Sequence, residues 1–309
     1  MKYKTFAYGL IVFLLFTGIF LSKKEGIKNT ENYDSNIAVY TKSSANSERI
    51  HINNNWTDTK TAGICTGDGT ESNPYTLKNL IIDAGGVGTA IRIENTIEHF
   101  KIENSTFFNS GGNFHDSGIQ LDNVSNGQLI NNTTYDNTHG MYIWSSLNLK
   151  IVRNRFYNLR GLNMVFTNDS IFYLNTFINS IYDIFFQWST NQYNSQKMFS
   201  YTYNGSSFTN YLGNYWSVYT EPDVDGDGLG DIPFMIDPFV ITNPRLRDYY
   251  PLIAPIDAYS NITIVKDSMD SIPGFNLITL LGVIGIITIL IVITNRNNEK
   301  NVNKKRIHF

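Results

Sequence analysis

Cysteine and charge are both scarce in this chain of 309 residues. Cys65 is its single cysteine, which excludes a disulfide framework and a cysteine-rich zinc site. Charged residues make up only 17% of the chain, with 24 Lys and Arg against 27 Asp and Glu. Because no basic surplus is available to neutralise phosphates, we expect no nucleic-acid partner.

Asparagine, by contrast, is abundant. The chain contains 38 asparagines, about one residue in eight, which is well above ordinary usage. A short amide side chain bonds to backbone groups in turns and tolerates left-handed backbone angles. Since 42% of the residues are hydrophobic, the chain is not wholly disordered. We therefore expect an apolar core surrounded by many polar corners.

The N-terminal end has the pattern of an export signal. Residues 1–22 carry Lys2 and Lys4 and then an apolar run, which is typical of a secretory signal peptide or of a retained signal anchor. Residues 23–50 are rich in Ser, Asn, Lys and Thr and have no apolar pattern. We predict a signal helix over the first segment and a flexible linker over the second.

The C-terminal end predicts a membrane anchor. Residues 274–294 are apolar and uncharged, and a helix of about 20 such residues spans the hydrocarbon layer. The tail over 295–309 is basic, which favours the cytoplasmic side. Residues 256–273 are then expected to form a stalk. The two ends together predict a protein of the cell surface, anchored in the membrane, with its bulk outside the cell.

A repeat occupies the middle of the chain. An asparagine, an aromatic residue and a second asparagine recur, and the first asparagine stands at Asn104, Asn132, Asn154 and Asn175. The spacings are 28, 22 and 21 residues. Short stretches of alternating apolar residues precede each copy, and alternation at period two is a strand signal.

A period of this length with short strands predicts one coil for each repeat. The strands of successive coils would pair about 4.8 Å apart, and their inward apolar positions would form a continuous core. We predict an all-β fold, a single-stranded parallel β-helix over residues 51–215, closed by a segment over residues 216–255. The four repeat asparagines are expected to stack as a structural ladder at one corner.

Two stretches of sequence resemble a known family. One is Trp56–Tyr75, which contains AGICTGDGTESNPY at residues 62–75, and the other combines Gly213–Ser217, Asp223–Asp231 and Asp248–Leu252. They are similar to the opening and closing segments of archaeal secreted β-helix proteins of the NosD-like, pectin-lyase-fold group. The resemblance covers about residues 50–255 and implies a right-handed coil. The chain's end, from Ile272, also resembles archaeal sorting signals, in which the helix is removed.

An acidic run is the best-defined candidate metal site. Asp223, Asp225, Asp227 and Asp231 stand at positions 1, 3, 5 and 9 of a glycine-containing loop, the arrangement that presents several oxygens to one Ca²⁺ ion. Phe234 stands at position 12, where EF-hand loops carry a bidentate glutamate. A structural calcium and a metal-free Asp/Gly turn are the two interpretations.

No residue is predicted to be catalytic. Glycoside hydrolysis needs two converging carboxylates, and the acids of the repeats stand singly. The family name suggests copper, but copper sites need clustered His, Met or Cys. The extracellular part has few of these at any ligand spacing, and His115 and His139 stand about one coil apart. A polysaccharide lyase or glycoside hydrolase, and a copper-related accessory protein, remain as alternatives.

Aromatic residues fall at neighbouring strand positions of successive coils. These residues are Tyr142, Trp144, Phe166, Tyr182, Phe186 and Trp188. Tyr142, Trp144, Tyr182 and Trp188 are the candidates for stacking against a ligand, and filling of the core is the alternative. We therefore predict a non-catalytic surface module that binds carbohydrate or a surface protein, or serves in the envelope.

Overall fold

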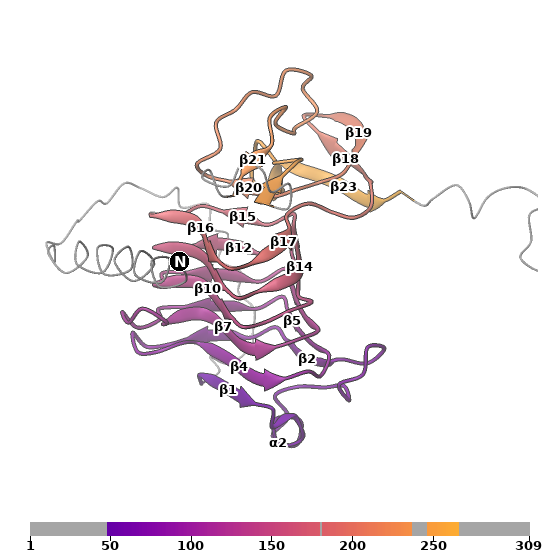
Figure 1. Ribbon diagram of the computed structural model, residues 1–309. Coiled ribbons are helices and arrows are strands. Elements are labelled where there is room, and N and C mark those ends of the chain that lie inside the picture. Colours follow the sequence, from indigo (N-terminus) through magenta and orange to yellow (C-terminus); the bar gives the residue numbers. More distant parts are fainter. Residues whose placement is uncertain (1–47, 180, 237–245, 266–309) are drawn as a thin grey trace, which may run out of the picture. The chain divides into compact units, whose positions relative to one another are not determined.

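The computed structural model describes residues 48–179, 181–236 and 246–265 (Figure 1). The predicted signal helix over 1–22, the membrane helix over 274–294 and the basic tail over 295–309 lie outside these residues. So does most of the linker predicted over residues 23–50. Within the described part of the chain, no helix is long and apolar enough to cross a membrane.

Three parallel sheets of six strands each form a β-helix, because every coil contributes one strand to each sheet. Sheet I contains β1 (Ile50–Asn53), β4 (Ile91–Thr96), β7 (Ser117–Val124), β10 (His139–Trp144), β13 (Arg160–Val165) and β16 (Tyr182–Gln187). Sheet II contains β2 (Tyr75–Lys78), β5 (Phe100–Glu103), β8 (Gly127–Ile130), β11 (Lys150–Val152), β14 (Asn168–Tyr173) and β17 (Thr190–Gln192). Sheet III contains β3 (Ile81–Asp83), β6 (Thr106–Phe108), β9 (Thr133–Tyr135), β12 (Arg155–Tyr157), β15 (Thr176–Phe177) and β20 (Tyr215–Trp216). The described chain is thus all-β apart from short helices.

The core is built from apolar rows that keep their register from coil to coil. In sheet I, Met141 pairs with Ile119 on one side and with Leu162 on the other, and all three are buried. In sheet III, the rings of Phe156 and Phe177 stack with centroids 4.7 Å apart. Burying such a side chain contributes about 1.5–3 kcal/mol, so the stacked rows are the main source of stability.

A ladder of buried asparagines lies at the corner between sheets II and III. The side-chain oxygens of Asn154, Asn175 and Asn214 each accept hydrogen bonds of 2.8–3.2 Å from the backbone and side-chain nitrogens of the asparagine one coil earlier. The ladder begins at Asn132. Three of the predicted residues, Asn132, Asn154 and Asn175, therefore lie in one row, and Asn214 extends it into the closing segment.

Asn104 does not belong to this ladder, contrary to the prediction. Ser105 occupies the ladder position, and its backbone N–H donates to the Asn132 side-chain oxygen at 3.0 Å. Asn104 has a left-handed backbone, with φ of 55°, and donates to the Asn79 side chain at 2.6 Å. The left-handed corner residue directly precedes the ladder residue, and both positions favour asparagine. In this coil the asparagine stands at the corner, so the sequence repeat marks a position one residue before the ladder.

A second amide ladder lies at the corner between sheets III and I. The side-chain nitrogen of Asn137 donates to the side-chain oxygen of Asn158 at 2.9 Å. A Cβ atom on Gly140 would lie 2.5 Å from the Asn158 side-chain nitrogen, so only glycine fits beside this ladder. A Cβ atom on Gly118 or Gly161 would crowd the side-chain nitrogens of Asn137 and Asn179 in the same way, so these three glycines make room for the second row of amides.

The ends of the β-helix are covered by other elements. At the first coil, α2 (Trp56–Thr61) places Trp56 on Tyr75, with ring centroids 4.8 Å apart. Beyond the last coil lie two small antiparallel sheets. The first contains β18 (Phe199–Tyr203), β19 (Ser206–Asn210) and β23 (Tyr259–Ile264), and the second pairs β21 (Phe234–Met235) with β22 (Arg247–Asp248).

The start of the predicted stalk is part of this closing structure. Residues Ile256–Ala258 form a short 3-10 helix, and β23 pairs antiparallel with β18. The prediction of a stalk from residue 256 is therefore wrong as far as Ile264. The strand stays in place because Tyr259 is buried beside Tyr203, with ring centroids 4.9 Å apart.

Candidate functional site

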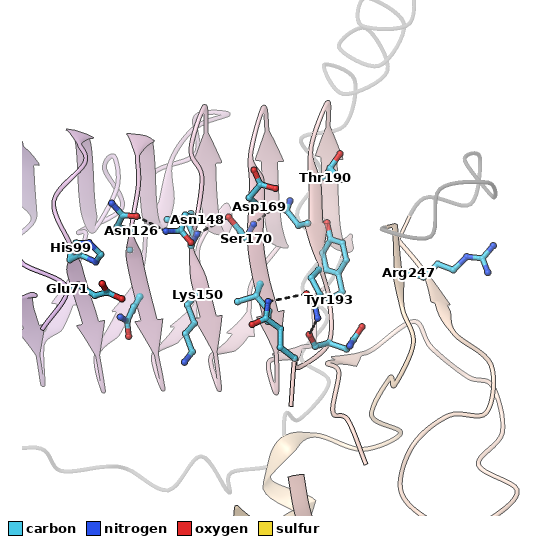
Figure 2. A pocket seen from close by; sticks show the side chains of 18 of the residues that line it. Glu71, His99, Asn126, Asn148, Lys150, Asp169, Ser170, Thr190, Tyr193 and Arg247 are labelled. Carbon is cyan, nitrogen blue, oxygen red and sulfur yellow. Dashed lines mark hydrogen bonds between the residues drawn. The ribbon is translucent and has the colours of Figure 1, made fainter. Parts of the chain in front are cut away.

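A polar groove runs across the outer side of sheet II. It has a volume of about 650 Å³ and crosses the successive strands β8, β11, β14 and β17. Figure 2 shows its lining side chains coming from neighbouring coils, with Asn126, Asn148 and Asp169 at the start of each strand. Glu71 and His99 lie at one end and Arg247 at the other. The groove therefore follows the direction in which the coils stack.

The middle of the groove offers polar groups with unused bonding capacity. Lys150 pairs in register with Gln128 on β8, and both side chains line the groove. Neither side chain has a hydrogen-bond or ion-pair partner within the described residues, and Lys150 is exposed. A lysine provides donors, and a carboxamide provides both donors and acceptors. These two residues can therefore bind a ligand without losing an internal contact.

An exposed aromatic column stands at the corner between sheets I and II. We give this name to Trp144, Phe166 and Trp188, which are 39%, 45% and 69% exposed. The rings of Phe166 and Trp188 stack with centroids 4.9 Å apart, and Trp144 meets Phe166 edge-on at 5.6 Å. Three large rings in successive coils are thus held together at the surface.

Two residues of the aromatic column have a strained backbone. Phe166 has φ of 53° and Trp188 has φ of 48°. The equivalent position in earlier coils is left-handed too, but there it is occupied by small polar residues such as Asn123 and Ser145. A residue with a bulky side chain pays about 1–2 kcal/mol for this conformation. The rings are therefore exposed at a cost that asparagine would avoid.

Two of the predicted stacking residues lie elsewhere. Tyr142 is only 3% exposed, because Phe114 and His115 pack against its ring. Burial raises the pKa of Tyr142 to about 12. Tyr182 is half-buried, with its hydroxyl 3.3 Å from the Nε2 of His139. The structure therefore leaves Trp144 and Trp188 at the surface and joins them with Phe166.

The acidic run forms a cluster of three carboxylates. Asp223, Asp225 and Asp227 each place an oxygen within 4.8 Å of the others, so together they could hold one cation. Burial raises the pKa of Asp227, and the two neighbouring acids raise it further. Asp231 does not join them, since its side chain accepts a hydrogen bond from the Val224 backbone N–H at 2.7 Å.

Backbone donors stabilise this loop without a metal. Asp223 accepts hydrogen bonds from the N–H groups of Gly226 and Gly228 at 2.8 and 2.9 Å. The loop also docks on the closing sheet, because the Tyr201 hydroxyl donates to the Asp227 backbone carbonyl at 3.0 Å. Three clustered oxygens fit calcium chemistry, and the same loop also satisfies a metal-free turn, so both interpretations of the sequence stay open.

The most deeply buried carboxylate is structural. Asp248 is fully buried at the end of the asparagine ladder and accepts hydrogen bonds from the Asn214 backbone N–H at 2.7 Å and the Trp216 indole at 2.9 Å. The Tyr250 backbone N–H donates to its other oxygen at 3.1 Å. Burial raises the pKa of Asp248 to about 7. Its oxygens are occupied by protein donors, so Asp248 closes the β-helix.

Within the described residues, no histidine belongs to a group of three or more His, Cys, Asp or Glu that could hold a metal ion. The group found there consists of Asp223, Asp225 and Asp227. His139 is buried, with Nδ1 lacking a hydrogen-bond partner, and burial lowers its pKa to about 4. His115 shares Phe114 and Tyr142 as neighbours with His139, but two histidines without a third soft ligand are a poor copper site.

Comparison with known proteins gives a family. The family model described as "Periplasmic copper-binding protein (NosD)" matches residues 12–221, about two thirds of the chain. Neither a curated protein nor a solved structure gave a match. The matched range contains every strand of the three parallel sheets, from β1 to β20. The chain therefore belongs to the NosD family of β-helix proteins.

Proposed function

We propose that this protein is a non-catalytic, right-handed β-helix module that works outside the cytoplasm and binds carbohydrate. The aromatic column carries the proposal. Its rings are exposed in adjacent coils, and two of them keep a left-handed backbone that costs about 1–2 kcal/mol each. A flat apolar ring that also tolerates water matches the C–H face of a sugar, while the polar groove beside it can bind hydroxyl groups.

The proposed location rests on the family and on the ends of the chain. The family description is periplasmic, and residues 1–22 have the pattern of an export signal. We include in the proposal that residues 274–294 anchor the protein in a membrane. The β-helix would then stand at the cell surface, where polysaccharides of the envelope are within reach.

A calcium ion in the loop around Asp223 is a further part of the proposal, with a structural role. The loop contacts β18 and β23 through Tyr201 and Tyr259, so a bound ion would stiffen the closing structure. The family description also names copper, but the described histidines do not supply a donor set for it. We therefore assign no role to copper in the proposed function.

Binding to a panel of immobilised polysaccharides, with the purified full chain, tests the proposal. Burying a tryptophan ring against a ligand contributes about 1.5–3 kcal/mol. Trp188→Asn should therefore weaken binding about tenfold or more. Phe114→Asn is the matched control, since Phe114 is 59% exposed against 69% for Trp188 but lies outside the aromatic column.

The stability of the same variant provides a second check. Asparagine suits a left-handed backbone, so Trp188→Asn should be at least as stable as the wild type while it binds less. Absence of binding to every polysaccharide, or equal binding by Trp188→Asn, would contradict the carbohydrate proposal. Release of shorter fragments from any of the polymers would contradict the non-catalytic part.

A further inference from the structure

We infer that the groove on sheet II holds an extended, uncharged polysaccharide chain that runs along the stacking direction of the coils. This inference rests on the proposed function and names its ligand class. The groove crosses four successive strands of one sheet, and such strands lie about 4.8 Å apart. A ligand that uses the whole groove must therefore present similar groups at similar intervals, as a polymer does.

Equivalent polar positions repeat along the groove. Gln128, Lys150, Ile171 and Gln192 are paired in register on consecutive strands, and all four line it. At the corner, the Asn148 side-chain nitrogen donates to the Asn126 side-chain oxygen at 2.6 Å. Three of the four positions are polar and Ile171 interrupts the row, so a chain of sugars can meet a polar side chain of this row on β8, β11 and β17.

Carboxamides dominate the polar groups of this surface. Seven of the lining residues are amides placed at or beside the strands: Asn126, Gln128, Asn148, Asn191, Gln192, Asn194 and Gln196. An amide donates and accepts hydrogen bonds at the same site, and so does a sugar hydroxyl. This lining suits a polyhydroxylated ligand better than a phosphate or a metal, which need donors only or acceptors only.

The charges that line the groove are balanced. Two acids, Glu71 and Asp169, are matched by two bases, Lys150 and Arg247. A polyuronate would be attracted by the two bases and repelled by the two carboxylates, and an amino-sugar cation the reverse, so a charged chain gains no net attraction to offset the cost of removing its charges from water. The balance favours an uncharged chain.

The aromatic column lies close along the chain to residues that line the groove. Thr190 lines the groove and follows Trp188 by two residues, while Asp169 follows Phe166 by three. Both segments turn the corner from sheet I into sheet II at this point. A sugar ring stacked on the column can therefore belong to a chain whose hydroxyl groups reach Lys150 and Gln128.

The test compares uncharged with acidic polymers and then short with long oligomers. Cellulose, xylan, mannan and β-1,3-glucan are the uncharged probes, and polygalacturonate and alginate are the acidic ones. We expect the full chain to bind one or more of the uncharged polymers and neither of the acidic ones. For oligomers of a bound polymer, calorimetry should show an affinity that rises up to about four or five sugar residues, the span of the four strands, and then levels off.

A matched pair of lysines separates the groove from the rest of sheet II. Lys150 and Lys78 are both exposed on this sheet, but only Lys150 lines the groove. Lys150→Ala should weaken binding of a six-residue oligomer about fivefold, because the oligomer loses its hydrogen bonds to the Lys150 ammonium group. Lys78→Ala should leave that affinity unchanged.

The possible failures are distinguishable. Binding to no polymer would overturn the proposed function itself, and this inference with it. Binding only to acidic polymers, an affinity that does not depend on oligomer length, or equal effects of Lys150→Ala and Lys78→Ala would overturn this inference alone. In those cases the loss of binding in Trp188→Asn would still support the aromatic column as the carbohydrate site.

Discussion

Removing one amide from the middle of the asparagine ladder should destabilise the protein strongly. The Asn154 side-chain oxygen accepts hydrogen bonds from the backbone and side-chain nitrogens of Asn132, at 2.9 and 3.0 Å. Its nitrogen donates to the Leu129 carbonyl at 2.9 Å and to the Asn175 side chain at 3.1 Å. All of these bonds are buried. Asn154→Ala therefore removes these four bonds, and a fifth to the Val152 carbonyl at 3.2 Å, from a site that water does not reach.

The magnitude follows from the groups left behind. The Asn132 backbone N–H loses its side-chain partner, and the Leu129 carbonyl loses the amide that faces it. Leaving a buried polar group unsatisfied costs about 1–3 kcal/mol. With at least two such groups and a small cavity, we expect Asn154→Ala to lower the free energy of unfolding by about 3 kcal/mol or more.

Asn104 supplies the control, because the sequence repeat gives it the same place as Asn154. Asn104→Gly keeps the left-handed backbone and loses the exposed side-chain bonds to Asn79 and Asn131, so it should cost about 1 kcal/mol or less. Urea denaturation of both full-length variants, followed by circular dichroism, measures the difference. Equal destabilisation of the two variants, or a loss below about 1 kcal/mol for Asn154→Ala, would refute the reasoning.

Three further outcomes concern pH and calcium. Burial raises the pKa of Asp248 to about 7, so the wild type should lose up to about 4 kcal/mol of unfolding free energy as pH rises from about 4 to about 7. Urea denaturation of Asp248→Asn should not show this loss. Burial lowers the pKa of His139 to about 4, so the wild type should lose stability as pH falls from about 6.5 to about 4, and His139→Gln should lose less. Millimolar Ca²⁺ should raise the thermal midpoint of the wild type and of Asp231→Asn, whereas Asp225→Asn should not respond; an unchanged wild-type midpoint would favour the metal-free turn.

The coil period could be predicted because the positions that set it tolerate few alternatives. Asn132, Asn154 and Asn175 occupy a buried row where an amide satisfies two coils at once. Gly140 has no room for a Cβ atom beside the second ladder. The placement of Asn104 could not be predicted, because asparagine also suits the exposed left-handed corner one residue earlier.

The candidate site was only partly visible in the sequence. The sequence predicts Trp144 and Trp188 as stacking residues, and both are exposed, although Trp188 lies at the corner after β16 and not in the strand. Tyr142 lies two residues before Trp144 in β10, but it is covered by Phe114, which comes from a loop of the preceding coil. The groove on sheet II was missed, since its lining residues carry no motif. The recurrence of Gln128, Lys150 and Gln192 at the coil period is a signal that could have found it.

The asparagine ladder also has an electrical direction. At each step the amide N–H group points toward the later coil and the oxygen toward the earlier one, so the small dipoles add, as peptide dipoles do along an α-helix. The positive end of this row faces Asp248, which accepts from the Asn214 side chain at 3.2 Å. Coils could be added or removed before Asp248 without changing the direction of the ladder dipole. The number of coils and the acid that ends the ladder can therefore vary independently.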